Sequence, residues 1–135
     1  MKYIIFIGLV FILSACVTFR VVGDFPVYGR VVDKISQEPI ADVEIVLKHV
    51  AVTFKSGSTT KTLAKVVTDS EGRFFIPENK TLIKGGTGGL AGYIADWPSL
   101  ELRREGFCTR YSKMSDKESY QNMTIQLDRK DDNCL

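Results

Sequence analysis

The sequence predicts an all-β protein, folded as a single antiparallel β-sandwich of about seven strands. Apolar residues recur at every second position, most clearly in residues 43–47 and 123–127, which is the period of a strand with one buried face. No stretch of about eleven residues or more keeps the 3.6-residue apolar stripe of a helix. Turn residues separate the alternating segments at short intervals. Two packed antiparallel sheets need this combination of features.

The expected strands cover residues 27–32, 43–54, 64–67, 74–76, 100–102 and 123–127. The second of them changes phase, because apolar residues occupy odd positions up to Leu47 and even positions from Val50 onward. A flat strand would turn half of these side chains to the wrong face of the sheet. We therefore expect a bulge or bend near Lys48 and His49. We interpret His49 as a residue of this irregularity rather than as a ligand or general base.

Turn residues divide the expected strands. Gln37-Glu38-Pro39 separates the first two strands, and residues 55–60 predict a flexible polar connection. Residues 68–72, with the sequence TDSEG, predict a tight hairpin between residues 64–67 and 74–76. In such a turn Asp69 accepts backbone N–H groups and Gly72 supplies the positive φ. Calcium is not needed to explain these residues, because the other ligands of an EF-hand loop are missing.

The N-terminus has the pattern of an export signal. Lys2 gives a positive start, residues 4–13 are almost wholly apolar, and Leu-Ser-Ala-Cys at residues 13–16 closes the segment. An apolar run of about ten residues is half of what a helix needs to cross a bilayer. The segment resembles the signal peptide and lipobox of a bacterial lipoprotein. The resemblance implies that Cys16 carries lipid, and an unlipidated secretory signal is the alternative.

The lipoprotein pattern divides the chain into four parts. A signal peptide would cover residues 1–15, a lipidated tether 16–24, the β-sandwich 25–129 and a polar tail 130–135. Lipid on Cys16 would attach the protein to a membrane of the bacterial envelope. In the resembled proteins an aspartate after the cysteine can favour retention in the inner membrane, and Val17 stands at this position. The outer membrane is therefore the expected location.

Charge and motif content exclude several classes of function. The 18 Lys and Arg residues nearly balance the 16 Asp and Glu residues, which leaves a net charge of +2 and no basic face for a nucleic acid. Gly86, Gly88 and Ala91 match a formal G-x-G-x-x-A, but the flanks lack a βαβ unit, so no nucleotide is expected. The chain has one histidine and no glycine-framed serine. We therefore expect that the protein is not an enzyme and that it binds neither a metal nor another cofactor.

Two cysteines remain once Cys16 carries lipid. Outside the cytoplasm a disulfide is the default use of a pair such as Cys108 and Cys134. The closed loop of roughly 27 residues would stabilise the fold by about 3 to 4 kcal/mol in the chain-entropy model. Two unpaired thiols are the alternative. A metal site is less favoured, because no close ligand spacing is present.

Three segments carry a resemblance to a known domain family. They are VYGRVVD at residues 27–33, EPIADVEI at 38–45 and TDSEGRFFI at 68–76. Together they resemble the carboxypeptidase regulatory-like domain family, and the resemblance covers residues 25–129. It implies a transthyretin-like, or prealbumin-like, β-sandwich. In that family the domain often accompanies a catalytic or transport domain and contributes no chemistry itself.

Residues 78–97 depart from the compact pattern of this family. They are longer than a sandwich hairpin needs and predict a loop. This loop is either a flexible glycine-rich connection or a partner-binding loop, in which Tyr93 and Trp97 offer aromatic anchors to a protein partner in the envelope. The expected function is that of a structural or protein-interaction module. The alternative is a module that binds a saccharide or other envelope polymer, with Tyr28, Tyr93, Trp97 or Tyr111 facing a sugar ring.

Overall fold

The structure, a computed structural model, describes residues 17–22, 25–53, 57–86, 93–114, 120–130 and 134. Within these ranges the chain forms nine strands and contains no α-helix. The strands are β1 (Val17–Val22), β2 (Val27–Asp33), β3 (Glu44–Thr53), β4 (Gly57–Val67), β5 (Arg73–Ile76), β6 (Thr81–Gly86), β7 (Tyr93–Arg103), β8 (Arg110–Lys113) and β9 (Met123–Leu127). The predicted all-β class is confirmed.

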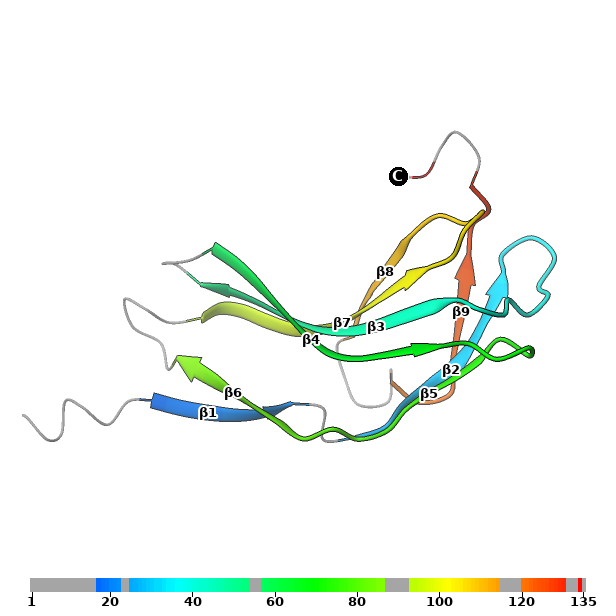
Figure 1. The fold of residues 1–135 in the computed structure, drawn as a ribbon. Helices are drawn as coiled ribbons and strands as arrows, with labels where there is room; N and C mark the ends of the chain where they lie inside the picture. Colours follow the sequence, from blue (N-terminus) through cyan, green and yellow to red (C-terminus); the bar gives the residue numbers. More distant parts are fainter. Residues whose placement is uncertain are drawn as a thin grey trace, which may run out of the picture.

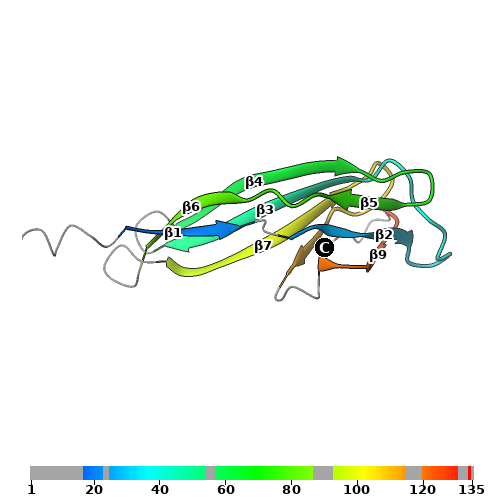
Figure 2. The same ribbon diagram turned by 90° about the horizontal axis from the view of Figure 1, so that it is seen from below.

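Seven of these strands form the two layers of a β-sandwich (Figure 1). One layer has the strand order β4-β3-β7-β8 and the other has the order β5-β2-β9. The remaining strands, β1 and β6, form a two-stranded ribbon that continues the layer of β2 and β5 (Figure 2). One pairing departs from the antiparallel pattern, because β9 runs parallel to β2. This is possible because the chain reaches β9 from the opposite layer rather than through a hairpin.

The hydrophobic core lies between the inner faces of the two sheets. Alternation places one side of each central strand inward, as the sequence predicts. The buried residues include Val27, Val31, Val43, Ile45, Leu47, Phe74, Ile76, Leu100, Leu102, Ile125 and Leu127. Phe25, just before β2, packs edge-on against the buried Tyr120, with their ring centroids 4.5 Å apart. The core therefore contains residues from both sheets and from the segments that precede β2 and β9.

A bulge interrupts the pairing of β3 with β4 at the predicted position. The register shifts between Leu47 and Lys48, which leaves Leu63 of β4 as the extra residue. β3 itself stays regular against β7 at this point. His49 and Ala51 consequently remain on the same side of β3 as Leu47, and both are buried. A bulge therefore lies at the predicted position, but it belongs to β4. The expected change of phase in β3 is wrong, because Val50 and Val52 lie on the opposite side of β3 from Leu47.

The prediction of a hairpin at residues 68–72 is wrong. β4 and β5 belong to different sheets, and these residues carry the chain from one sheet to the other. The local chemistry is nevertheless the expected one. Asp69 Oδ1 accepts the N–H groups of Glu71 and Arg73 at 2.9 and 2.8 Å, and Gly72 has a φ of 69°. A turn signal bends the chain, but it does not specify the strand with which the next residues pair.

Several predicted loops are strands in the structure. Residues 81–86 and 93–97 of the expected long loop belong to β6 and β7, residues 57–60 open β4, and residues 17–22 of the expected tether form β1. β1 pairs with β6 along its whole length, from Val17 opposite Gly86 to Val22 opposite Thr81. Main-chain hydrogen bonds need no alternation of side chains, so β6 and the start of β4 leave little signal in the sequence. Residues 17–21 of β1 do alternate between apolar and polar residues.

A disulfide joins Cys108 to Cys134, as predicted, with the Cα atoms 5.5 Å apart. It connects the C-terminal tail to the segment between β7 and β8. Two backbone hydrogen bonds hold the same region, from Cys108 N–H to the Asp128 carbonyl and from Lys130 N–H to the Gly106 carbonyl, both at 2.8 Å. The bond therefore links the end of the chain after β9 to the four-stranded sheet.

β2 and β9 approach each other closely at Gly29. A Cβ atom at this position would lie 2.4 Å from the carbonyl oxygen of Met123 and 2.8 Å from the Met123 Cβ. Backbone atoms of a paired strand have little room to withdraw, so the parallel register of β9 requires a residue without a side chain here.

Gly29→Ala should therefore lower the stability of the fold. We expect a loss of about 1 to 3 kcal/mol, as for other substitutions that force extra atoms into a packed site. The midpoint of thermal or urea unfolding, followed by circular dichroism, measures the effect. Thr60→Ala on the exposed edge strand β4 is the control and should stay within about 0.5 kcal/mol of the parent protein. Equal midpoints for all three proteins would contradict the close approach of β9.

Candidate functional site

An aromatic pair lies on the outer face of the three-stranded sheet. Phe74 and Ile76 of β5 are buried, and Phe75 between them points outward with 59% of its surface exposed. Tyr28 of β2 stands directly opposite Phe75 in the ladder. Their ring centroids are 6.4 Å apart and their planes are inclined by 31°. The contact stabilises the pairing of the two strands by about 0.2 to 1 kcal/mol and leaves most of Phe75 open to a ligand.

Two arginines lie beside this aromatic pair. Arg30 of β2 stands opposite Arg73 of β5, and both are exposed. Like charges directly opposite each other destabilise a sheet. Arg73 forms an ion pair with Glu71, whereas Arg30 forms none with any described residue. The face therefore carries positive charge that the described side chains do not fully neutralise.

The aromatic and basic side chains line a shallow groove of about 730 Å³. This volume lies within the range of small-molecule and peptide sites. The groove is lined by Tyr28, Arg30, Arg73, Phe75, Asn122 and Thr124, among others. Asp69 also reaches its rim, but the carboxylate of Asp69 is bound by the turn that follows β4. Rings, guanidinium groups and small polar side chains together suit a partner with a flat or extended part and an acidic group.

The outer face of the four-stranded sheet holds a different charged cluster. Glu101 of β7 is only 1% exposed and lies beneath Lys48, Arg103 and Tyr111. Lys48 Nζ donates to one carboxylate oxygen, while Arg103 Nε and the Tyr111 hydroxyl donate to the other at 2.6 and 3.3 Å. Burial alone would raise the pKa of Glu101, but the Lys48 and Arg103 hydrogen bonds outweigh it and lower the pKa. The cluster holds β3, β7 and β8 together and leaves no free carboxylate oxygen.

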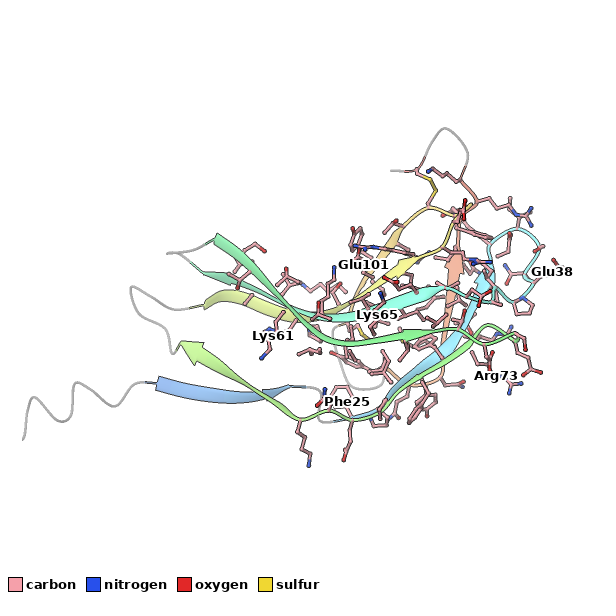
Figure 3. The ribbon with its side chains drawn as sticks, viewed as in Figure 1. Phe25, Glu38, Lys61, Lys65, Arg73 and Glu101 are labelled. Atoms are coloured by element: carbon pink, nitrogen blue, oxygen red, sulfur yellow. A yellow bond between two sulfur atoms is a disulfide. The ribbon has the colours of Figure 1, made fainter. Side chains whose placement is uncertain are left out.

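A third polar cluster lies where β2 ends. Asp33 Oδ1 accepts the N–H groups of Ile35 and Ser36 at 2.8 and 3.0 Å, and Arg129 Nε donates to Oδ2 at 2.5 Å. The Arg129 hydrogen bond is the main reason that the pKa of Asp33 falls to about 2. The carboxylate ties the turn after β2 to the residues that follow β9 (Figure 3 labels Glu38 in this turn). The role of the Asp33 carboxylate is structural, because both of its oxygens accept hydrogen bonds from groups of the protein itself.

The sequence-predicted aromatic anchors lie on a strand rather than on a loop. Tyr93 pairs with Thr53 and Trp97 pairs with Val50 in the ladder between β3 and β7. The side chains of Tyr93 and Trp97 lie outside the described part of the structure. So does Cys16, the predicted lipidation site, together with the signal segment.

The other two aromatics considered for saccharide binding lie on opposite sheets. Tyr28 lines the groove, whereas Tyr111 lies beside Glu101 on the four-stranded sheet. Sequence reasoning missed Phe75, Arg30 and Arg73 as site residues. One signal was available, because Phe75 is apolar at a position where the alternation of β5 requires a side chain on the solvent face.

Among the residues that the structure describes, no three His, Cys, Asp or Glu side chains are grouped as metal ligands. In the same residues, no helix is long and apolar enough to cross a membrane. Comparison of the chain with protein-family models, with curated proteins and with solved structures found no significant match.

Acid should destabilise the protein as Asp33 becomes protonated. The pKa of Asp33 is about 2 in the folded protein and about 3.9 in an unfolded chain, so the unfolded chain binds the proton first. The stabilisation is complete above about pH 5 and is lost as the pH falls towards 2. Urea midpoints measured between pH 7 and pH 2.5 test this dependence.

Asp33→Asn should show a smaller loss of stability between pH 5 and pH 2.5 than the parent protein. Arg129→Gln, which removes the donor that lowers this pKa, should reduce the acid dependence in the same direction. Parallel pH profiles for the parent protein and Asp33→Asn would show that another carboxylate controls acid unfolding.

Proposed function

We propose that the protein is a non-catalytic, lipid-anchored module of the bacterial envelope, which binds a protein partner through the groove on the outer face of the three-stranded sheet. The observation that carries this proposal is the exposed Phe75 next to an arginine pair in which Arg30 has no ion-pair partner among the described residues. A monomeric scaffold gains nothing from this arrangement. An acidic segment of a partner would cover Phe75 and pair with Arg30.

The two charged sheet faces support this assignment by their contrast. On the four-stranded sheet, Lys48 and Arg103 surround a carboxylate that belongs to the protein itself. On the three-stranded sheet, Arg73 pairs with Glu71 of the turn before β5, and Arg30 opposite it has no carboxylate partner among the described residues. Arg30 therefore lacks the kind of partner that Glu101 supplies to Lys48 and Arg103. A carboxylate supplied by a partner completes the second cluster in the same way.

The anchor part of the proposal rests on the sequence. The Leu-Ser-Ala-Cys pattern at residues 13–16 and the apolar run before it are the features of a lipoprotein signal. Lipid on Cys16, with more than one acyl chain, would give a stable attachment, and Val17 after it favours the outer membrane. The carboxypeptidase regulatory-like domain remains the family that we propose for residues 25–129, in agreement with the β-sandwich fold.

A saccharide or other envelope polymer is the second candidate partner. The observation that favours it is the Tyr28–Phe75 pair, with ring centroids 6.4 Å apart, beside Asn122 and Thr124 on the groove wall. Aromatic rings that pack against a sugar and small polar groups that bind its hydroxyls form a common kind of site. The arginines would then select an acidic sugar.

Attachment through Cys16 predicts that Cys16→Ser releases the protein from membranes. The parent protein should fractionate with membranes and the variant with the soluble fraction, because lipid on Cys16 is the proposed anchor. Mass spectrometry of the N-terminal peptide should find a lipid-modified Cys16 in the parent. Full retention of the variant in the membrane fraction would contradict the lipid anchor.

Partner binding through the groove predicts a position-specific cross-link in cells. A photoreactive amino acid at Phe75 should give a discrete protein adduct, and Arg30→Glu in the same chain should abolish it. The control position is Tyr111, which is 68% exposed but lies on the other sheet. The same adducts from both positions would contradict a specific groove. Binding of an acidic glycan by the purified protein, lost in Phe75→Ala, would instead establish the saccharide candidate.

A further inference from the structure

The first strand begins directly after the proposed lipidation site. β1 starts at Val17, the residue that follows Cys16, and it is paired with β6 from its first residue, because Val17 stands opposite Gly86. One residue of extended chain spans about 3.3 Å. A lipid on Cys16 would therefore hold the ribbon of β1 and β6 within a few ångströms of the bilayer surface. In the described part of the chain, pairing thus begins at the residue that follows the proposed lipidation site.

Other strand ends gather at the same end of the molecule. Figures 1 and 2 show that β6 and β3 end, and that β4 and β7 begin, at the end where β1 starts. The registers agree, since Thr53 stands opposite Gly57 and Tyr93. We call this the ribbon end, made of residues 17–20, 50–53, 57–61, 84–86 and 93–97. The turn after β2 and the crossing between β4 and β5 lie at the opposite, loop end, where Figure 3 labels Glu38 and Arg73.

The residues of the ribbon end suit an anionic lipid surface. Its basic residues are Arg20, Lys61 and Lys84, and its acidic residue is Asp96. Basic residues close to anionic headgroups attract a protein to a membrane. The ribbon end also contains Phe19, Tyr93 and Trp97, and tyrosine and tryptophan are enriched at the level of lipid headgroups.

We propose that the ribbon end docks on an anionic bilayer surface, so that the sandwich stands with its long axis away from the membrane. The occupant of this surface is the headgroup layer of the membrane that holds the lipid anchor. The inference rests on the proposed lipidation of Cys16 and goes beyond it, because an anchor alone does not fix an orientation.

Energy transfer from two positions on the lipidated, full-length protein tests the orientation. The protein is reconstituted into vesicles of phosphatidylcholine and phosphatidylglycerol that contain a rhodamine-labelled lipid. A fluorescent amino acid replaces Ser58 at the ribbon end or Ile35 at the loop end, and both positions are exposed. The eleven residues of β4 alone span more than about 30 Å. Energy transfer to the rhodamine lipid should quench most of the fluorescence at position 58. The fluorescence at position 35 should be largely retained.

Lipid charge and one lysine test the chemistry of the surface. Vesicles of phosphatidylcholine alone should reduce the difference between positions 58 and 35. Lys61→Glu should reduce it on anionic vesicles, because it places a negative charge at the docking end. Lys130→Glu, at another exposed lysine outside the ribbon end, is the matched control and should leave the difference unchanged.

The outcomes separate this inference from the function on which it rests. Protein that fails to float with the vesicles would overturn both the lipid anchor and the docking. Protein that floats but transfers energy equally from both positions would overturn the docking and leave the anchor standing. Unequal transfer that responds neither to lipid charge nor to Lys61→Glu would overturn the anionic surface as the partner.

Discussion

The two sheets of the sandwich are joined through the hydroxyl group of Thr68. This buried group accepts the N–H of Val43 at 2.9 Å and donates to the carbonyl of Ile40 at 2.8 Å. The backbone N–H of Thr68 donates in turn to the carbonyl of Val43 at 3.1 Å. The connection from β2 to β3 and the crossing from β4 to β5 are thereby bonded to each other. Without the Thr68 hydroxyl, the Val43 N–H and the Ile40 carbonyl, both in the connection from β2 to β3, would lose this partner, at about 1 to 3 kcal/mol each.

The register of the candidate site follows from this crossing. Four residues after Thr68, the carbonyl of Gly72 accepts the N–H of Val31 at 2.8 Å. A side chain at Gly72 would place its Cβ 2.4 Å from the Val31 carbonyl oxygen, and its φ of 69° also favours glycine. β5 therefore enters the ladder with Arg73 opposite Arg30, and two residues later Phe75 meets Tyr28. The groove is thus a consequence of how the chain passes between sheets.

Sequence reasoning predicted the parts of the fold in which burial leaves an alternating pattern. Residues 43–47 and 123–127 alternate because one side of each strand faces the core, and both lie in strands of the structure. β6 and the first half of β4 were missed because polar residues and glycines there pair through the main chain, with no alternation to mark them. β1 was missed for another reason: residues 17–21 do alternate, but they follow the proposed lipidation site and were assigned to the tether. The pairing of β5 was also missed, because the turn residues Asp69 and Gly72 serve a hairpin and a crossing equally well.

The candidate site was only partly predictable for a related reason. Tyr28 was considered as a single aromatic, but its neighbour Phe75 follows it by 47 positions in the sequence and reaches it only through the ladder. The disulfide was predictable because two cysteines outside the lipidation motif leave one pairing. A site made of side chains from several strands depends on which strands pair, and the local pattern of one strand does not show which distant strand is its partner.

The arrangement of the molecule also limits how a partner reaches the groove. Arg73 lies at the loop end (Figure 3), on the far side of the sandwich from the strand ends that surround β1. In the proposed orientation the bilayer lies at the ribbon end, so the arginines stand more than one strand length, roughly 15 to 20 Å, above the headgroups. Salt screens charges over about 8 Å at physiological ionic strength. In this orientation anionic lipids of the same membrane cannot neutralise Arg30, so the proposed acidic partner of the groove would have to extend beyond the membrane surface.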